Sequence, residues 1–147
     1  MGVQTIALLV LLSATCGAQD ALGTWKINTS KSRFHGPPPK SMTVRYEPQV
    51  WTFYQVRYDG TAETISQTLR FDGKDYPCGD LGLEERPDTV MSRKPDARTT
   101  EVFYKESGRV TRRLVRTISA DGRQMTLDIR ITPAKGPAVE RRLIFER

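Results

Sequence analysis

The 147-residue sequence is poor in the residues on which metal sites and disulfide-stabilised folds depend, with two cysteines and one histidine. Two cysteines are too few for a disulfide framework or a zinc ribbon. The single histidine, His35, excludes a His-rich metal site and argues against a histidine-dependent nucleophilic mechanism. No apolar run reaches the roughly 20 residues that a membrane-spanning helix needs. The composition, 37% hydrophobic and 27% charged, is that of one ordinary globular domain.

The first 18 residues differ from the rest because they carry no charged side chain. An apolar run, Ile6–Leu12, is followed by small residues, and Cys16 and Ala18 stand at the −3 and −1 positions of a cut before Gln19. This pattern predicts a secretory signal peptide over residues 1–18, a mature domain over residues 19–147 and a secreted or periplasmic location. Two alternatives stay open, a lipoprotein signal ending at Cys16 and a buried N-terminal strand.

The predicted mature chain keeps one cysteine, Cys78, so it cannot form a disulfide within the chain. We interpret Cys78 as a free, half-buried thiol beside a loop, with a disulfide between two chains as the alternative. Stability then has to come from a hydrophobic core, which a domain of this length can supply.

The net charge of +6 is unevenly placed. Residues 19–108 hold 13 basic and 13 acidic side chains, whereas residues 109–147 hold 10 basic and 4 acidic ones. Arginine outnumbers lysine 16 to 7, and its planar fork of donors suits carboxylate and phosphate groups. The charge indicates either a solvated face or recognition of an acidic ligand, lipid or polyanion.

Segments rich in β-forming residues alternate with turn pairs such as Asp59-Gly60 and Asp121-Gly122. In residues 124–132 the apolar side chains Met125, Leu127 and Ile129 recur with a period of two, as a half-buried strand requires. Strands are predicted over residues 22–28, 41–47, 50–59, 61–71, 88–94, 99–106, 109–119, 124–132 and 139–147. Residues 80–86 are predicted to form at most one helical turn.

About nine strands without a long helix leave a β-sandwich or a closed barrel as the architecture. Consecutive tight hairpins favour an all-β, antiparallel up-and-down β-barrel of about 8–10 strands, whose closure would remove sheet edges. The long connection over residues 29–40 contains three consecutive prolines, 37–39, and is predicted to be a stiff strap.

Gly23-Thr24-Trp25 opens the first predicted strand and resembles the G-x-W motif of lipocalins and the opening of fatty-acid-binding proteins. That resemblance implies that Gly23 and Trp25 lie at one end of a barrel, with the tryptophan often covered by an arginine from a late strand. Stretches over residues 23–44, 71–77, 88–102 and 121–127 resemble a family of small secreted bacterial proteins of lipocalin-like shape. This resemblance implies a lipocalin-like fold and export, and it implies no activity.

The late strands carry the most informative constellation. In an extended chain Arg112 and Arg116 share a face with Leu114, and Arg141 shares a face with Phe145. If these faces look inward, three guanidinium groups enter or border the barrel interior, where a charge must be paired or hydrated. The alternatives are a bulge that turns Arg112 outward, or pairing of these arginines with Glu101 or Asp128 on neighbouring strands.

We therefore predict an exported, non-catalytic binding module for a small amphipathic or anionic ligand held in a barrel cavity. The predicted ligand-binding residues are Arg112, Arg116, Arg141, Leu114, Leu127, Ile129 and Phe145. The alternative is a cell-envelope interaction protein with a side-chain-filled barrel and a basic surface that meets an anionic envelope surface. A cavity of about 300 Å³ or more favours the binding module. No catalytic residue, cofactor, metal or nucleic-acid partner is predicted, and the chain is expected to be a monomer.

Overall fold

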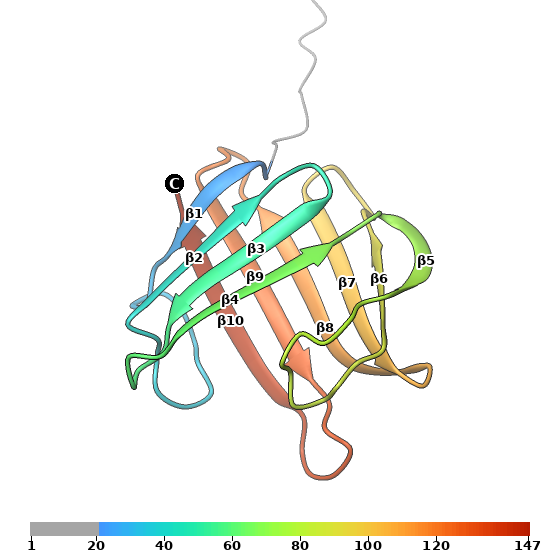
Figure 1. The fold of residues 1–147 in the computed structure, drawn as a ribbon. Coiled ribbons are helices and arrows are strands. Elements are labelled where there is room, and N and C mark those ends of the chain that lie inside the picture. The colour runs from blue at the N-terminus through green and yellow to red at the C-terminus, as the bar shows by residue number, and fades with distance from the viewer. Residues whose placement is uncertain (1–20) are drawn as a thin grey trace, which may run out of the picture.

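The computed structural model describes residues 21–147, and the predicted signal peptide of residues 1–18 lies outside the described residues. The described chain forms ten strands (Figure 1). They are β1 (Gly23–Ile27), β2 (Ser41–Tyr46), β3 (Val50–Val56), β4 (Ala62–Thr68), β5 (Asp72–Pro77), β6 (Thr89–Arg93), β7 (Thr99–Glu106), β8 (Arg109–Ile118), β9 (Gln124–Ile131) and β10 (Val139–Glu146). Within residues 21–147, no helix is long and apolar enough to span a bilayer.

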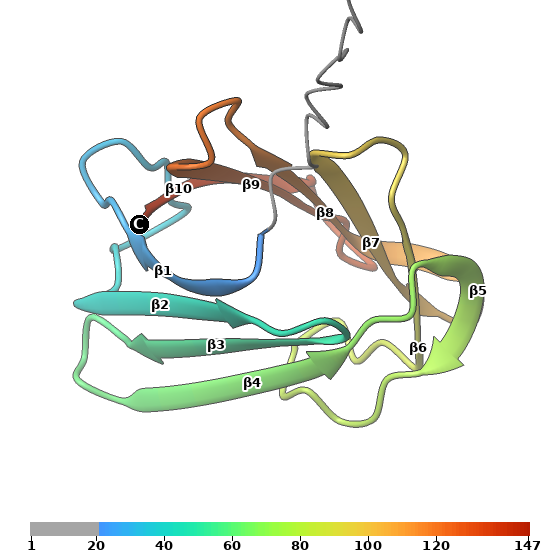
Figure 2. The ribbon, with the colours of Figure 1, turned by 90° about the horizontal axis from the view of Figure 1, so that it is seen from above.

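The ten strands belong to one antiparallel sheet in the order β4-β3-β2-β1-β10-β9-β8-β7-β6-β5. Strands that are consecutive in sequence pair with each other, except β4 and β5, and β1 also pairs with β10, which joins the two halves of the chain. The sheet curls until β2, β3 and β4 lie across the interior from β8, β9 and β10 (Figure 2). The prediction of an all-β, antiparallel up-and-down barrel is confirmed.

One part of that prediction was wrong: the barrel does not close by strand pairing, so two sheet edges remain. The order of the sheet ends at β4 on one side and at β5 on the other, and these two strands do not pair with each other. The sequence missed β5 because its residues, DGKDYP, are polar or turn-forming and are mostly exposed. Its pairing with β6 is irregular between Asp72 and Asp75, so β5 resembles an edge strand that discourages further pairing.

Residues 80–86, where at most one helical turn was expected, form no helix. Gly79, Gly82 and Arg86 have φ angles of 69°, 67° and 46°, and no right-handed helix contains such a series. The segment between β5 and β6, residues 78–88, is a folded loop (the 78–88 loop) that lies at the lower end of the barrel in Figure 1.

The core follows the predicted alternation, since Met125, Leu127 and Ile129 of β9 are all buried. Trp25 is completely buried, and its indole N–H donates to the Ala21 carbonyl oxygen at 2.8 Å. The guanidinium carbon of Arg147 lies 4.3 Å from the centre of a Trp25 ring. The first strand and the end of the chain are thereby fixed to each other.

The predicted strap is fastened to β10 by its backbone. Arg33 and Arg142 exchange two backbone hydrogen bonds, of 2.7 and 3.1 Å. The Ser32 hydroxyl donates to the Asn28 carbonyl oxygen and accepts from the Ile144 amide. These bonds place the following residues, including His35, beside the lower end of the barrel.

Candidate functional site

The larger interior cavity has a volume of about 880 Å³ and opens at the barrel end where the 78–88 loop and the β9–β10 connection lie (Figure 1). This volume is in the range of sites that hold small molecules. Its apolar wall includes Phe53, Leu114, Ile129, Ile131 and Leu143. The envelope alternative required an interior filled by the protein's own side chains, and this cavity shows that part of the interior is not filled.

Strand β8 sends two arginines inward because of a bulge placed just before them. Tyr104 of β7 faces Arg112 while Lys105 faces Val110, which leaves Thr111 as the additional residue on β8. Thr111 is completely buried, and Val110 is 38% exposed. The bulge considered from the sequence exists, but it turns Val110 rather than Arg112 out of the barrel.

Most charges that border the larger cavity are already paired. At its rim Arg57 contacts Glu63 at 3.0 Å, and Arg109 contacts Glu106 at 3.3 Å. Deeper inside, Arg112 donates from Nε to Oε1 of Glu85 at 2.7 Å, and its Nη2 lies 2.6 Å from the same oxygen in an ion pair. Neither Glu101 nor Asp128 pairs with Arg112, because both carboxylates bind arginines on the outer face of the sheet.

Arg141 is half-buried, unlike Glu84 and Arg86, the exposed lining charges that also lack an ion pair within residues 21–147. Within residues 21–147 it forms no ion pair with a carboxylate, and its buried Nε has no hydrogen-bond partner. Burial and the neighbouring Arg112 lower the pKa of Arg141, while Glu85 and Glu84 oppose that shift. Because a guanidinium stays protonated in proteins, the buried Nε of Arg141 keeps a donor without an acceptor, and no carboxylate of residues 21–147 forms an ion pair with this charge.

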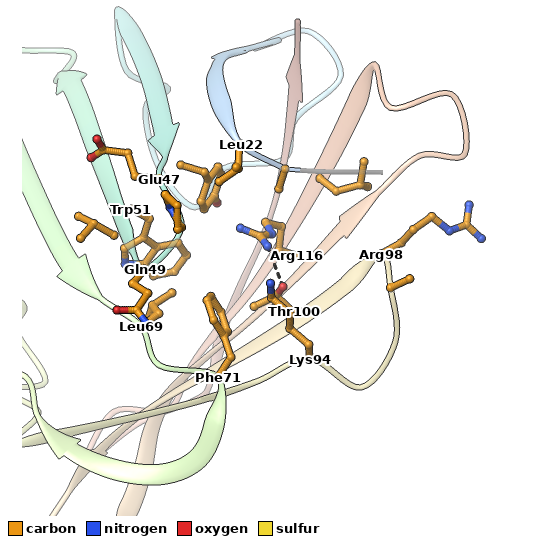
Figure 3. A pocket seen from close by; sticks show the side chains of 16 residues that line it. Leu22, Glu47, Gln49, Trp51, Leu69, Phe71, Lys94, Arg98, Thr100 and Arg116 are labelled. Atoms are coloured by element: carbon orange, nitrogen blue, oxygen red, sulfur yellow. Dashed lines mark hydrogen bonds between the residues drawn. The ribbon is translucent and has the colours of Figure 1, made fainter. Parts of the chain in front are cut away.

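A smaller cavity of about 270 Å³ lies at the opposite end of the barrel and contains Arg116 (Figure 3). Arg116 is 8% exposed, and its Nη2 donates to the Thr100 hydroxyl at 2.7 Å. Its guanidinium carbon lies 4.3 Å from the centre of the Tyr46 ring. The buried Nε of Arg116 and the buried hydroxyl of Tyr46 have no hydrogen-bond partner within the described chain. Burial raises the pKa of Tyr46 to about 12 against the opposing influence of Arg116.

The other charged residues around the smaller cavity make it still more positive. The Lys94 ammonium lies 4.5 Å from the centre of the Phe71 ring and points toward the space between Phe71 and Thr100 (Figure 3). Glu47, the one acidic residue of its lining, turns away and lies 3.8 Å from Arg45. Of the three cations that line the smaller cavity, Lys94 and Arg116 point inward and Arg98 points away, and no carboxylate from residues 21–147 points inward (Figure 3).

Trp51 separates the two cavities, because it lines both of them and is 3% exposed. Its ring packs edge-to-face on Phe53 at 5.1 Å and tilted on Tyr46 at 6.0 Å. The sequence placed the three inward arginines in one site. The structure places Arg112 and Arg141 on one side of Trp51 and Arg116 on the other.

The predicted apolar contacts divide in a similar way. Leu114 and Ile129 line the larger cavity, whereas Leu127 and Phe145 are completely buried and line neither of the two cavities. Sequence reasoning missed Glu85 as the partner of Arg112. The adjacent pair Glu84-Glu85 was visible, but no periodicity indicates which side chain of an irregular loop points inward.

Other candidate groups play structural or peripheral parts. His35 borders the larger cavity from the strap and is itself exposed. Cys78 is a free, half-buried thiol that contacts the Pro87 carbonyl oxygen at 3.2 Å, and burial raises its pKa. The carboxylate of Asp75 binds Lys105 at 2.8 Å. No cluster of three or more potential metal-ligating side chains occurs in residues 21–147.

The chain matches no family model and no curated protein. Solved structures with a similar fold include zebrafish ileal bile acid-binding protein complexed with cholic acid. That structure has a TM-score of 0.51 at 12% identity and covers 86% of this chain and 98% of its own. A mutant of the fluorescent protein UnaG has a TM-score of 0.50 at 17% identity, with coverage of 86% and 95%. At these identities the likeness concerns the fold, and it supports the barrel of lipocalin and fatty-acid-binding type.

Proposed function

We propose that this protein is a non-catalytic binding module that holds a small amphipathic anion in its larger cavity. The observation that carries the proposal is the 880 Å³ space with a half-buried Arg141 on its wall, whose buried Nε has no hydrogen-bond partner. An acidic head group would supply the missing charge and hydrogen-bond acceptor, and the apolar wall would cover the tail. The zebrafish protein of similar fold, whose structure contains cholic acid, is a precedent for this use of the fold.

The energetic terms favour an amphipathic ligand over a purely polar one. Covering apolar surface contributes roughly 25 cal/mol per Å². A charge-assisted hydrogen bond to arginine adds about 1.5–3 kcal/mol, and more of this is realised when the donor has no competing partner. Together these terms make micromolar affinity reachable without a specialised polar network.

The test compares decanoate with 1-decanol, two probes that share a chain and differ in the acidic group. We expect Arg141→Met to weaken decanoate binding by about tenfold to a hundredfold, because it removes a charge-assisted contact. Binding of 1-decanol should change less than about twofold. Calorimetric titration measures both affinities, and Trp51, on the cavity wall, provides a fluorescence signal.

The adjacent Arg142 is a matched control for that experiment. It faces the outside of β10, where it binds both oxygens of Asp128 at 2.6 and 3.1 Å. Arg142→Met removes the same charge and should leave both affinities within about twofold of the original. Equal losses in the two variants would mean that the effect is long-range electrostatics, and failure of both probes to bind would reject the function.

We also propose that the chain is exported and processed before Gln19, since residues 1–18 have the pattern of a signal peptide. The mass of the protein recovered from its own cells tests this directly. A product that begins at Gln19 in the secreted or periplasmic fraction is expected. A cytoplasmic product that retains residues 1–18, or a lipidated one that begins at Cys16, would contradict the proposal.

A second candidate function is binding of a compact carboxylate in the smaller cavity. Arg116 favours it, because this buried cation has an unpartnered Nε and no carboxylate from residues 21–147 beside it. Apolar contacts from Leu69 and Phe71 would suit a short or aromatic body. Benzoate is the appropriate probe, and its binding should be lost in Arg116→Leu and kept in Arg141→Met.

A further inference from the structure

The 78–88 loop covers part of the larger cavity and is attached to the barrel in an unusual way. At its base, Cys78 and Asp88 are joined by a backbone hydrogen bond of 3.1 Å, and the Asp88 amide donates to the Lys105 carbonyl oxygen at 2.8 Å. Between these anchors, residues 79–87 make polar contacts to the barrel through one side chain only, Glu85 on Arg112. Leu81 and Leu83 supply apolar contacts from the same loop to the cavity.

Glu85 is more deeply buried than the two residues beside it. Its side chain is 6% exposed, whereas Glu84 and Arg86 on either side are exposed. Both contacts from Arg112 reach Oε1, and the buried Oε2 has no hydrogen-bond partner. The carboxylate is thus buried with only half of its acceptor capacity in use, an arrangement that costs free energy.

The carboxylate of Glu85 occupies the place beside Arg112 where the acidic group of a ligand would bind. It neutralises Arg112 inside the cavity, and its charge also acts on Arg141, whose pKa it raises. Among residues 21–147, Glu85 is therefore the carboxylate that pairs with Arg112 and acts most strongly on Arg141, and one ion pair holds its loop to the barrel. An entering acid would compete directly with Glu85, which would regain full hydration outside.

We propose that Glu85 is a built-in counter-anion that an acidic ligand displaces from Arg112, so that binding of the acid releases the 78–88 loop. This inference rests on the proposed function and specifies how the same site is regulated. An uncharged amphiphile has no means of displacing Glu85, so it would bind with the loop still attached. The loop is then a selector that couples opening to the acidic group of the ligand.

The test uses Glu85→Gln with Glu84→Gln as its control. The two variants remove the same charge from adjacent positions of one loop, but only Glu85 contacts Arg112. We expect Glu85→Gln to tighten decanoate binding by about tenfold or more, because the competing carboxylate is gone. Binding of 1-decanol should stay within about twofold in both variants. Decanoate binding should tighten much less in Glu84→Gln, because Glu84 forms no ion pair with Arg112 and acts on Arg141 more weakly than Glu85 does. An unchanged or weaker decanoate affinity in Glu85→Gln would overturn the proposal.

A measurement on the unmodified protein keeps the proposal testable if Glu85→Gln does not fold. Decanoate should increase amide hydrogen exchange in residues 79–87, and 1-decanol should not. Slower exchange in this loop with decanoate would show closure over the ligand and overturn the proposal. If neither probe binds any variant, the proposed function fails; if both bind and Glu85→Gln behaves like Glu84→Gln, only the displacement mechanism fails.

Discussion

Arginines on the outer face of the late strands have carboxylate partners on neighbouring strands, whereas arginines on the inner face do not. On the outer face, arginines meet carboxylates at directly opposite positions of neighbouring strands, as in Arg142 with Asp128 and Arg130 with Glu140. On the inner face, Arg116 lies opposite Leu127 and Thr100, and Arg141 lies opposite Ile129. Cross-strand pairing therefore satisfies the outer charges and leaves the inner ones for another partner.

This difference explains why the excess positive charge of residues 109–147 does not form a simple basic surface. Arg113, Arg130 and Arg142 are engaged in ion pairs outside the barrel. Inside, Arg112 depends on a loop carboxylate, and Arg116 on a hydroxyl group. Outer arginines contribute modestly to stability, whereas burial of the inner ones costs desolvation. Under the proposed function, an acidic ligand would supply the partner that the inner ones lack.

The largest loss of stability should come from removing the side chain of Trp51, which separates the two cavities. We expect Trp51→Ala to lower the free energy of unfolding by about 3–5 kcal/mol, because a large buried aromatic is replaced by a void that joins both cavities. Tyr54→Ala, on the outer face of the same strand, is the control, since Tyr54 is 45% exposed. Its loss should stay below about 1 kcal/mol. Urea unfolding measures both, and equal losses would erase the contrast between the faces.

Substitution of Arg116 is expected to change the free energy of unfolding by a smaller amount and in the opposite direction, as a gain of stability. Replacing a buried cation that lacks a carboxylate by an apolar side chain removes its desolvation cost, so Arg116→Leu should raise the free energy of unfolding by about 1 kcal/mol or more. The same variant should lose benzoate binding. A gain of stability together with a loss of binding would identify Arg116 as a ligand-binding residue rather than a structural one.

Arg113→Leu provides the matched outer variant. Arg113 is half-exposed and binds Glu101, which keeps Arg93 as a second partner. Its substitution should destabilise the protein by less than about 1 kcal/mol. If Arg116→Leu destabilises by several kcal/mol instead, the hydrogen bond to Thr100 and the contact with Tyr46 outweigh the cost of burial.

The sequence was sufficient to predict the sheet and the direction of its side chains. Alternation placed Arg112, Arg116 and Arg141 on inward faces because the period of a strand is independent of tertiary detail. It could not indicate depth along the barrel axis, which is set by strand tilt and stagger. For that reason Arg116 was grouped with Arg112, although Trp51 separates them.

The remaining errors concern segments without a period. β5 escaped prediction because an exposed edge strand needs no apolar alternation, and its polar residues also suit a turn. Glu85 escaped because the direction of its side chain is set by the φ angles at Gly79, Gly82 and Arg86. The most informative partner in the site therefore comes from the part of the chain that sequence reasoning describes least well.

The last prediction concerns how the stability that Glu101 contributes on the outer face of the sheet depends on pH. A hydrogen bond from Arg113 lowers the pKa of Glu101, burial opposes this, and Arg93 lowers it further. Since the carboxylate is favoured in the folded state, its contribution is present above its unfolded-state pKa of about 4.3 and is lost as the pH falls through the lower folded-state pKa. We expect Glu101→Gln to cost roughly 1 kcal/mol at neutral pH, because its arginine partners are half-exposed.

The difference between the original protein and Glu101→Gln should therefore shrink as urea unfolding is repeated from pH 7 to pH 3. Glu140→Gln is the control, because the Glu140 side chain is 69% exposed and its pair with Arg130 lies in water. That variant should differ little from the original protein at any pH. A cost for Glu101→Gln that stays constant down to pH 3 would show that Glu101 acts through packing, and the outer ion pairs would then lose their electrostatic role.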